Sequence, residues 1–263
     1  MAKAFPQNLA LPTLFQIARK LLRMGNELRA LLLPAKFNWK IGIKKETQFW
    51  DDWFRTKGAT KGTAKEATGP ARYRDRLNPD FPLQARPEAL LPVGDVHILD
   101  VGAGPLTYLG KKAVGRSLTI TAIDALAHEY DKILNKYSIQ PLVRTQKLDA
   151  ENLTARYGPN TFDLCFARNC LDHTYDPERA ILQMIQVVKK GRYVLLEHYP
   201  NEAENQHYSG LHQWNFDVSP DGDFLIYSKS TVTNFSKKYG DLAVISCEYI
   251  GQNLLVTRIL KPA

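Results

Sequence analysis

Short apolar runs alternate with amphipathic stretches through the middle of the chain. Each run is nearly continuous, which is the pattern of a strand covered on both faces of a parallel sheet. We predict strands at residues 97–101, 118–123, 142–148, 161–169 and 193–197. The stretches between them carry apolar residues three and four apart, and we predict helices at residues 106–114, 128–136 and 178–189. Strands that alternate with helices build an α/β sheet with helices on both faces.

The C-terminal part of the chain departs from this alternation. Residues 198–224 are polar and aromatic without a regular period, and a loop of this length in a compact domain is usually functional or disordered. A helix is predicted at residues 228–239. The apolar residues of 242–249 and 254–260 then predict an antiparallel hairpin, which would bring the sheet to seven strands.

The N-terminal part of the chain has helical periodicity but no strand pattern. An amphipathic helix is predicted from Thr13, as its N-cap, to residue 33, where Pro34 ends it. A second helix is predicted at residues 46–57. Its aromatic residues share one face, which suits either a core stripe or a lid over an acceptor pocket. Glycine and proline punctuate residues 58–92 and favour irregular connections there.

Charge divides the chain at nearly the same place. Residues 1–95 carry 17 Lys and Arg against 9 Asp and Glu, whereas residues 96–263 carry 18 against 18. We therefore predict a basic helical extension over residues 1–90 and a main domain over residues 91–263. The excess positive charge could attract an anionic substrate, or it could place residues 13–33 against an acidic membrane surface. Packing of this helix on the domain or on another subunit is the other prediction.

The first strand runs directly into a glycine turn, Asp100-Val101-Gly102-Ala103-Gly104-Pro105-Leu106-Thr107. Glycines at such a turn allow torsions that a Cβ would obstruct, and they let a ligand approach the main chain. A dinucleotide fingerprint requires a third glycine where Thr107 stands. An acidic residue ahead of the turn also suits a cationic ligand better than a pyrophosphate.

Two further strands end in carboxylates. Asp124 follows the second strand and Asp149 follows the third, so three successive strand–helix units carry an acidic residue at the strand end. Ligands bind at the carboxyl ends of strands in open α/β sheets, and an acidic residue after the second strand suits ribose hydroxyls. This order predicts a nucleoside site but does not choose between cofactors.

The glycine turn resembles the first motif of class I S-adenosylmethionine-dependent methyltransferases. Leu171-Asp172-His173 followed by Asp176-Pro177 is similar to a segment after the fourth strand of many small-molecule members. The resemblance covers about residues 91–260 and implies a Rossmann-like sheet, S-adenosylmethionine as cofactor and an acceptor-covering insertion at about 198–224. The cofactor residues that it implies are Asp100, Gly102, Ala103, Gly104, Pro105, Asp124, Ala125, Asp149, Ala150 and Asn169.

Histidines near the strand ends favour a hydroxyl as the methyl acceptor, because histidine has a suitable pKa to remove its proton. We predict His173 as the general base, with His198 as the second candidate, His212 as the third and Asp172 beside them. A role of His173 in the scaffold, contacting the cofactor, is the alternative. The predicted acceptor-binding residues are His207, Tyr208, His212 and Trp214. His198, His207 and His212 lack the helical spacing of a metal site, so no metal is predicted.

Three other functions stay open at this point: an N-methyltransferase of a small molecule, a nicotinamide-dependent oxidoreductase and a non-enzymatic binding module. The predicted acceptor is a small molecule or saccharide, with an anionic group favoured by the basic extension. The basic residues are dispersed and form no recognised nucleic-acid-binding module, so no nucleic acid is expected. The oligomeric state is left open.

The cysteines and the apolar content of the chain indicate in which cellular compartment we expect the protein. Cys165, Cys170 and Cys247 lack metal-ligand spacing and suit buried thiols in a reducing cytoplasm. No secretory pattern is present, and no apolar run approaches the roughly 20 residues that span a bilayer. We therefore expect a cytoplasmic protein, with contact to the inner membrane face as the alternative.

Overall fold

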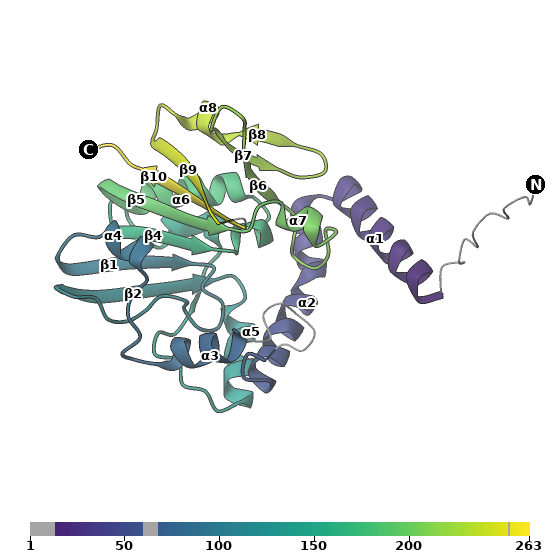
Figure 1. Ribbon diagram of the computed structural model, residues 1–263, viewed down its shortest axis with the longest axis horizontal. Helices are drawn as coiled ribbons and strands as arrows, with labels where there is room; N and C mark the ends of the chain where they lie inside the picture. The colour runs from purple at the N-terminus through teal and green to yellow at the C-terminus, as the bar shows by residue number, and fades with distance from the viewer. Residues whose placement is uncertain (1–13, 60–67, 252) are drawn as a thin grey trace, which may run out of the picture.

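The fold is built on a seven-stranded sheet with strand order β3-β2-β1-β4-β5-β10-β9 (Figure 1). The computed structural model describes residues 14–59, 68–251 and 253–263. The strands are β1 (Gly94–Val101), β2 (Arg116–Asp124), β3 (Gln146–Lys147), β4 (Phe162–Arg168), β5 (Val188–His198), β9 (Val244–Ile250) and β10 (Leu254–Leu260). Strand β10 pairs antiparallel with β5 and β9, and the other pairings are parallel. The predicted sheet and its C-terminal hairpin are confirmed.

Apolar side chains of the central strands alternate between two cores. Leu99 and Val101 of β1 pack in one core with α6 (Pro177–Val187). Ile98 faces the other core, which is completed by Leu83 and Leu91 from the segment before the sheet. Burial on both faces explains why these strands are continuous apolar runs.

The helices of the main domain begin at recognisable signals. Helix α5 (Ala127–Lys136) follows β2, and α6 starts with Pro177 in its first turn. The side chain of Asp176 caps α6 by accepting a hydrogen bond from the Arg179 amide at 2.9 Å. Short 3-10 turns cover Ala150–Ala155 and Leu171–His173. These turns follow the carboxyl ends of strands β3 and β4, where the chain turns toward a cavity.

The N-terminal helices extend further than predicted. Helix α1 (Leu14–Leu32) is confirmed over the described residues, with Thr13 outside them. Helix α2 (Ala35–Arg55) begins directly after Pro34, so the predicted helix at 46–57 is only its second half. Proline is compatible with a helix start, and Pro34 therefore both ends α1 and precedes α2.

The interpretation of residues 58–92 as irregular is correct only in part: α3 (Gly69–Leu77) and α4 (Ala85–Ala89) lie there, whereas residues 78–84 and 90–93 are irregular. Pro70 occupies the first turn of α3, where a missing N–H costs no helical hydrogen bond. Trp53 and Phe54 of α2 pack with Tyr73 of α3 and Tyr130 of α5, which joins the N-terminal helices to the main domain.

The predicted helix at residues 106–114 is also wrong, because this stretch is a series of turns. Backbone groups of residues 106–114 form hydrogen bonds with segment 76–84 instead of with one another, as they would in a helix. Gln84 donates to the carbonyl of Tyr108 at 2.9 Å, and the amide of Lys111 donates to the carbonyl of Phe81 at 2.8 Å. A Cβ on Gly110 would lie 2.0 Å from the carbonyl oxygen of Pro82, so the contact requires glycine.

The region after β5 forms a second sheet. It contains α7 (Glu202–Asn205), β6 (Asn215–Val218), β7 (Phe224–Tyr227), β8 (Val232–Asn234) and α8 (Phe235–Tyr239), with strand order β6-β7-β8. The helix predicted at 228–239 is therefore correct only in its last turn. Phe216 and Phe224 pack into the main core, which explains the aromatic content of this region. The strand predicted at 142–148 is reduced to β3.

We expect Thr107→Val to lower the free energy of unfolding by about 1–3 kcal/mol, because the variant leaves buried Asp100 without its hydroxyl donor. The Thr107 hydroxyl also accepts from the Leu109 amide at 3.1 Å, which fixes the non-helical turn. Urea unfolding measures the change. Thr119→Val, at an exposed position of β2, is the matched control and should change stability by less than about 0.5 kcal/mol. Equal stability of both variants would contradict the structural role of the hydroxyl.

Candidate functional site

A cavity of about 590 Å³ opens at the carboxyl ends of the central strands. Side chains of α2 form one of its walls, and the segment after α7 contributes another. Ten residues predicted from the sequence line it: Asp100, Gly102, Ala103, Gly104, Asp124, Ala125, Ala150, Asn169, His173 and His212. The topology therefore brings the glycine turn and two of the histidines to one space.

Two glycines shape the turn after β1. The φ angle is +66° at Gly102 and +65° at Gly104, in the left-handed region. A Cβ on Gly102 would lie 2.5 Å from the Cβ of Cys170, and one on Gly104 would lie 2.9 Å from Cζ2 of Trp50. The turn thus requires glycine both for its torsions and for two close approaches.

The carboxylate of Asp124 is held by the same turn. The Gly104 amide donates to its Oδ2 at 3.1 Å, and the Leu126 amide donates to its Oδ1 at 2.8 Å. Burial raises the pKa of Asp124 to about 6, although both amide hydrogen bonds favour the charged form. Each oxygen retains acceptor capacity, so the side chain can receive hydroxyl groups of a ligand.

Asp100 is the second buried carboxylate at the turn. It is 2% exposed, and its Oδ2 accepts from the Thr107 hydroxyl at 2.5 Å. Burial raises the pKa of Asp100 to about 7, against the opposing effects of the Thr107 hydrogen bond and the charge of Arg76. A cationic ligand would stabilise the charged form of this carboxyl group.

Arginine side chains form another wall of the cavity. Arg72, Arg76 and Arg168 line it together with Tyr108. The guanidinium of Arg168 lies 4.4 Å from the centre of the Tyr108 ring and is paired with Glu197. Burial lowers the pKa of Arg76 to about 10, and the neighbouring charges of Arg72 and Arg168 also lower it. Mutually repelling guanidinium groups on one wall favour an anionic ligand group.

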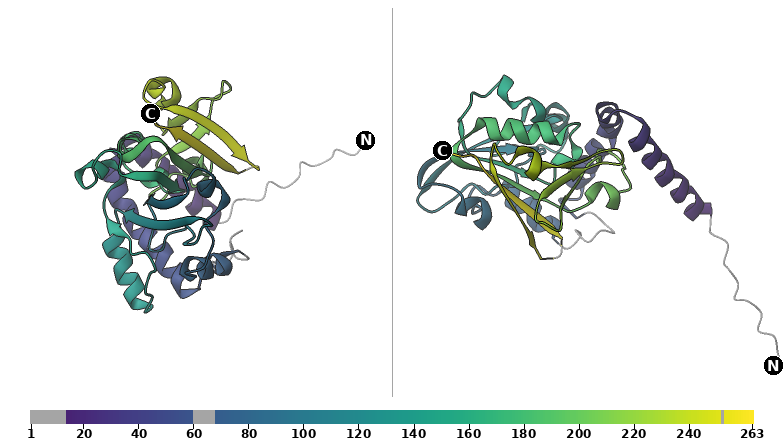
Figure 2. Two further views of the ribbon diagram at one scale, coloured as in Figure 1. Left: turned by 90° about the vertical axis from the view of Figure 1, so that its left-hand side faces the viewer. Right: turned by 90° about the horizontal axis from the view of Figure 1, so that it is seen from above.

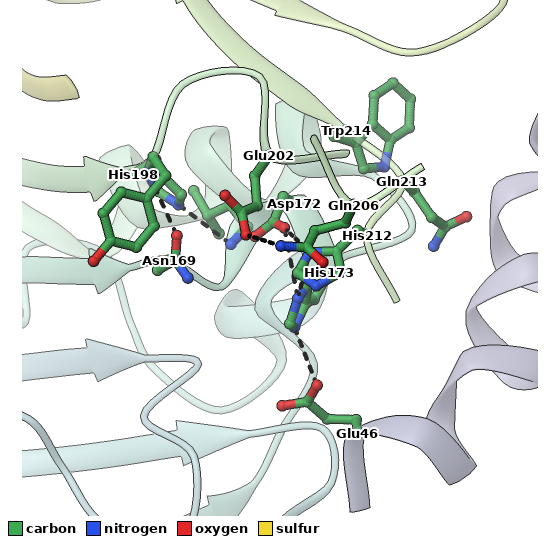
Figure 3. Close-up of polar contacts among 12 residues, drawn as sticks. Glu46, Asn169, Asp172, His173, His198, Glu202, Gln206, His212, Gln213 and Trp214 are labelled. Carbon is green, nitrogen blue, oxygen red and sulfur yellow. Dashed lines mark hydrogen bonds and ion pairs between the residues drawn. The ribbon is translucent and has the colours of Figure 1, made fainter. Parts of the chain in front are cut away.

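A buried aspartate organises the histidines (Figure 3). Asp172 is 1% exposed, and its Oδ2 accepts from Nδ1 of His212 at 2.6 Å. Nε2 of His173 lies 3.1 Å from that same His212 nitrogen and 3.5 Å from Asp172 Oδ2. Burial raises the pKa of Asp172, but His173 and His212 outweigh it and hold the pKa well below its usual range.

This cluster has two chemical uses. The ligand atoms of Asp172, His173 and His212 all lie within 4.8 Å of one another, a geometry that could hold a metal ion. The same atoms form a hydrogen-bonded cluster when no ion is bound, because the charged Asp172 carboxylate accepts a hydrogen bond from His212 and stabilises a proton on the neighbouring imidazoles. His173 and His212 both reach the cavity, whereas Asp172 lies behind them.

Helix α2 contributes a carboxylate on the other side of His173. Oε2 of Glu46 lies 3.8 Å from Nδ1 of His173, and Oε1 of Glu46 accepts from the Trp50 indole N–H at 2.8 Å. Burial lowers the pKa of His173, but Asp172 and Glu46 outweigh this effect, so its pKa is raised. Two carboxylates therefore face the two nitrogens of one imidazole.

His198 occupies a different environment. It is 2% exposed, packs against Phe216, and does not line the cavity. Its Nε2 accepts from the Leu171 amide at 3.3 Å, which places the ring proton on Nδ1. Burial lowers the pKa of His198 to about 4. This arrangement makes His198 a support for the turn that carries Asp172 and His173.

Several predicted residues lie behind the cavity wall. Asp149 accepts a hydrogen bond from the Tyr175 hydroxyl at 3.1 Å. Tyr208 is 2% exposed, and the Trp214 indole donates to the carbonyl of Thr174 at 3.0 Å. The predicted residues that do not line the cavity are Pro105, Asp149, Asp172, His198, His207, Tyr208 and Trp214.

Sequence reasoning missed several cavity residues, among them Glu46, Arg76 and Glu151, whereas Trp50 belongs to the aromatic face that it offered as a lid. Glu46 and Trp50 are four positions apart, which indicates a contact along a helix but not its place in the fold. Glu151 accepts from the Tyr175 amide at 2.9 Å, and burial raises its pKa to about 7. No local signal distinguishes Arg76 from the other arginines of its segment.

Comparison with known families matches residues 99–196 to the methyltransferase domain. Among solved structures, the chain is similar to an S-adenosylmethionine-dependent methyltransferase from Aquifex aeolicus, with 16% identity, a TM-score of 0.44, and coverage of 74% of this chain and 95% of that chain. It is also similar to phosphoethanolamine N-methyltransferase 2 of Haemonchus contortus, with 16% identity and a TM-score of 0.47. That alignment covers 76% of this chain and 58% of the Haemonchus enzyme. Comparison with curated proteins gives no match.

We expect His198 and His173 to titrate on opposite sides of the usual histidine value, 6.5. His198 should stay neutral with its proton on Nδ1 until about pH 4, because its burial disfavours the charged form. Since unfolded chains bind this proton from about pH 6.5, the contribution of His198 makes the free energy of unfolding fall as the pH is lowered from 6.5 to 4. Two-bond proton–nitrogen NMR during a pH titration measures the protonation state and the tautomer of both imidazole rings. Titration of His198 near 6.5 would contradict its buried environment.

Proposed function

Because residues 99–196 match a methyltransferase domain, we propose that this chain transfers a methyl group from S-adenosylmethionine to a hydroxyl oxygen of a small, anionic acceptor. The observation that carries the proposal is the single cavity that joins the glycine turn to His173. When bound, S-adenosylmethionine supplies an electrophilic methyl group on a sulfonium. The work of the protein is then to align the acceptor and to remove its proton.

The residues of the glycine turn fit this cofactor. Gly102 and Gly104 leave a cradle that side chains would fill. The free acceptor sites of Asp124 suit two ribose hydroxyls, and buried Asp100 suits the positive charge of the amino-acid end. Burial raises the pKa of both carboxyl groups, which a nearby cation would reverse.

A nicotinamide cofactor fits this turn less well. The pyrophosphate of such a cofactor binds at the N-terminus of a helix that follows the glycines. Residues 106–111 form no helix, and the amides of Leu109 and Lys111 are already bound to protein acceptors. The missing third glycine and the missing helix thus point away from an oxidoreductase.

His173 is the general base in our proposal. Asp172 and Glu46 raise its pKa, so the neutral ring is a stronger base than an isolated histidine. The proton of the acceptor hydroxyl would move to His173 while the methyl group passes from sulfur to the oxygen and S-adenosylhomocysteine leaves, and the Asp172 carboxylate would stabilise the resulting imidazolium. His212 fixes the orientation of Asp172 through the 2.6 Å hydrogen bond.

The arginine wall suggests the acceptor class. Arg72, Arg76 and Arg168 would bind a carboxylate or phosphate, and Tyr108 offers an aromatic face beside them. An acidic sugar combines the anion with hydroxyl acceptors. An amine acceptor is the second candidate, because Glu46 and Glu202 line the same cavity and suit a cation.

We expect S-adenosylhomocysteine to bind the purified protein and Asp124→Asn to weaken this binding about 10- to 100-fold, because the variant loses charged hydrogen bonds to the ribose. Calorimetric titration measures both affinities, with NADH titrated in parallel. Asp131→Asn, which alters an ion pair with Arg144 outside the cavity, is the control and should bind unchanged. Binding of NADH without S-adenosylhomocysteine would overturn the cofactor assignment.

We expect His173→Gln to lower kcat about 10²- to 10⁴-fold while S-adenosylhomocysteine binds within about twofold of the wild type, because only proton removal is lost. Release of S-adenosylhomocysteine with a panel of sugar acids and amines measures turnover. His128→Gln, at an exposed position of α5, is the matched control.

Wild-type turnover should also rise with pH through the raised pKa of His173, because the base acts in its neutral form. This pH limb should be absent in His173→Gln. Unchanged turnover in the variant, or methylation confined to amines, would exclude the proposed base and acceptor while leaving the cofactor assignment to the binding experiment.

A further inference from the structure

Helix α1 projects away from the rest of the molecule (Figures 1 and 2). The side chains of residues 16–25 are all exposed, so the apolar residues of this half of the helix are not part of the core. An isolated helix of this length is marginal in water, and most helical stability in proteins comes from packing of an apolar face. The projecting half therefore has the properties of an element that is completed by a partner.

Five of the exposed apolar side chains of α1 fall on one stripe, and the exposed side chains of Leu22 and Leu32 lie beside it. Ile17, Leu21, Met24, Leu28 and Leu31 recur at alternating intervals of four and three residues, and their exposed fractions are 42%, 62%, 57%, 56% and 52%. At 100° per residue this spacing keeps the five side chains on one face. A stripe of this size on a soluble protein marks an interaction surface.

The charges beside the stripe are mostly positive. Between residues 14 and 45 the chain carries eight Lys and Arg residues and a single acidic residue, Glu27. In α1 these are Arg19, Lys20, Arg23 and Arg29. The row continues along α2 as Lys36, Lys40 and Lys44, next to exposed Phe37 and Ile41. An apolar stripe bordered by basic residues is the pattern of a helix that lies in the interface of an anionic bilayer.

The C-terminal half of α1 is attached to the body. Arg29 donates to the carbonyl of Tyr208 at 3.2 Å, and Glu27 lies 3.5 Å from the ammonium of Lys229. Asn38 of α2 donates to the carbonyl of Leu33 at 3.2 Å. These contacts fix the direction of α1, so a surface that binds the helix also orients the body.

We propose that α1 binds in the plane of an anionic membrane surface, with its apolar stripe in the acyl boundary and its basic residues against the headgroups. A second copy of the chain fits less well, because pairing two α1 stripes would bring two strongly basic segments together. Among the described residues, no helix combines the length and apolar character needed to cross a bilayer. The proposal does not rest on the methyl-transfer reaction.

Binding of the full chain to vesicles tests the proposal. We expect the wild type to sediment with phosphatidylserine-containing vesicles and not with pure phosphatidylcholine, and the bound fraction to fall with added salt. The double variant Leu21→Asp, Leu28→Asp should lose at least tenfold in partitioning. Lys20→Gln with Arg23→Gln should weaken binding to the anionic vesicles alone.

The matched control is Val93→Asp with Val114→Asp, which changes two exposed apolar positions (78% and 90%) far from α1 in the chain and should bind as the wild type does. Circular dichroism and S-adenosylhomocysteine titration verify that each variant is folded. Absence of wild-type binding to anionic vesicles would overturn the proposal. So would light scattering that shows a dimer dissolved by Leu21→Asp, since the stripe would then be occupied by a second copy.

Discussion

The site depends on one constraint, the absence of side chains at Gly102 and Gly104. Gly102 lets the exit of β4 approach the turn at Cys170, and the chain continues from there to Asp172 and His173. Gly104 lets α2 approach through Trp50, one helical turn after Glu46. The two carboxylates that face His173 thus arrive from segments far apart in the chain by contacts with one turn. A Cβ at either glycine would separate the walls of the cavity.

Electrostatics gives this cavity two unlike sides. The carboxylates of Asp100 and Asp124 are costly to bury, and burial raises the pKa of each toward neutrality. Burial lowers the pKa of Arg76, the charge of Asp100 opposes this effect, and the charges of Arg72 and Arg168 add to it. These opposed costs are reduced together when a ligand brings a cation to the carboxylates and an anion to the arginines. A sulfonium donor with an anionic acceptor has this distribution of charge.

The sheet was predictable because a strand that is buried on both faces requires a continuous apolar run in the sequence. The acidic residues at the strand ends follow those runs directly. The errors come from signals with two structural meanings. Pro34 and Pro70 suggest breaks, yet proline also suits the start of a helix. Residues 106–111 have helical spacing, but segment 76–84 supplies competing hydrogen-bond partners that only the tertiary fold brings near. The same holds for the site: Glu46 and Arg76 reach it through packing of helices that no local pattern positions.

Helix α2 connects the proposed membrane surface to the chemistry. Its first half carries exposed Phe37 and Ile41, and its second half carries Glu46 and Trp50 at the cavity. Because α2 is a continuous helix of 21 residues without a hinge, the distance between its two ends is fixed. Attachment through α1 would therefore hold the cavity at a constant height above the headgroups. Such a geometry selects acceptors presented near an acidic surface, which gives the uneven basic charge of the N-terminal third a role separate from the arginine wall.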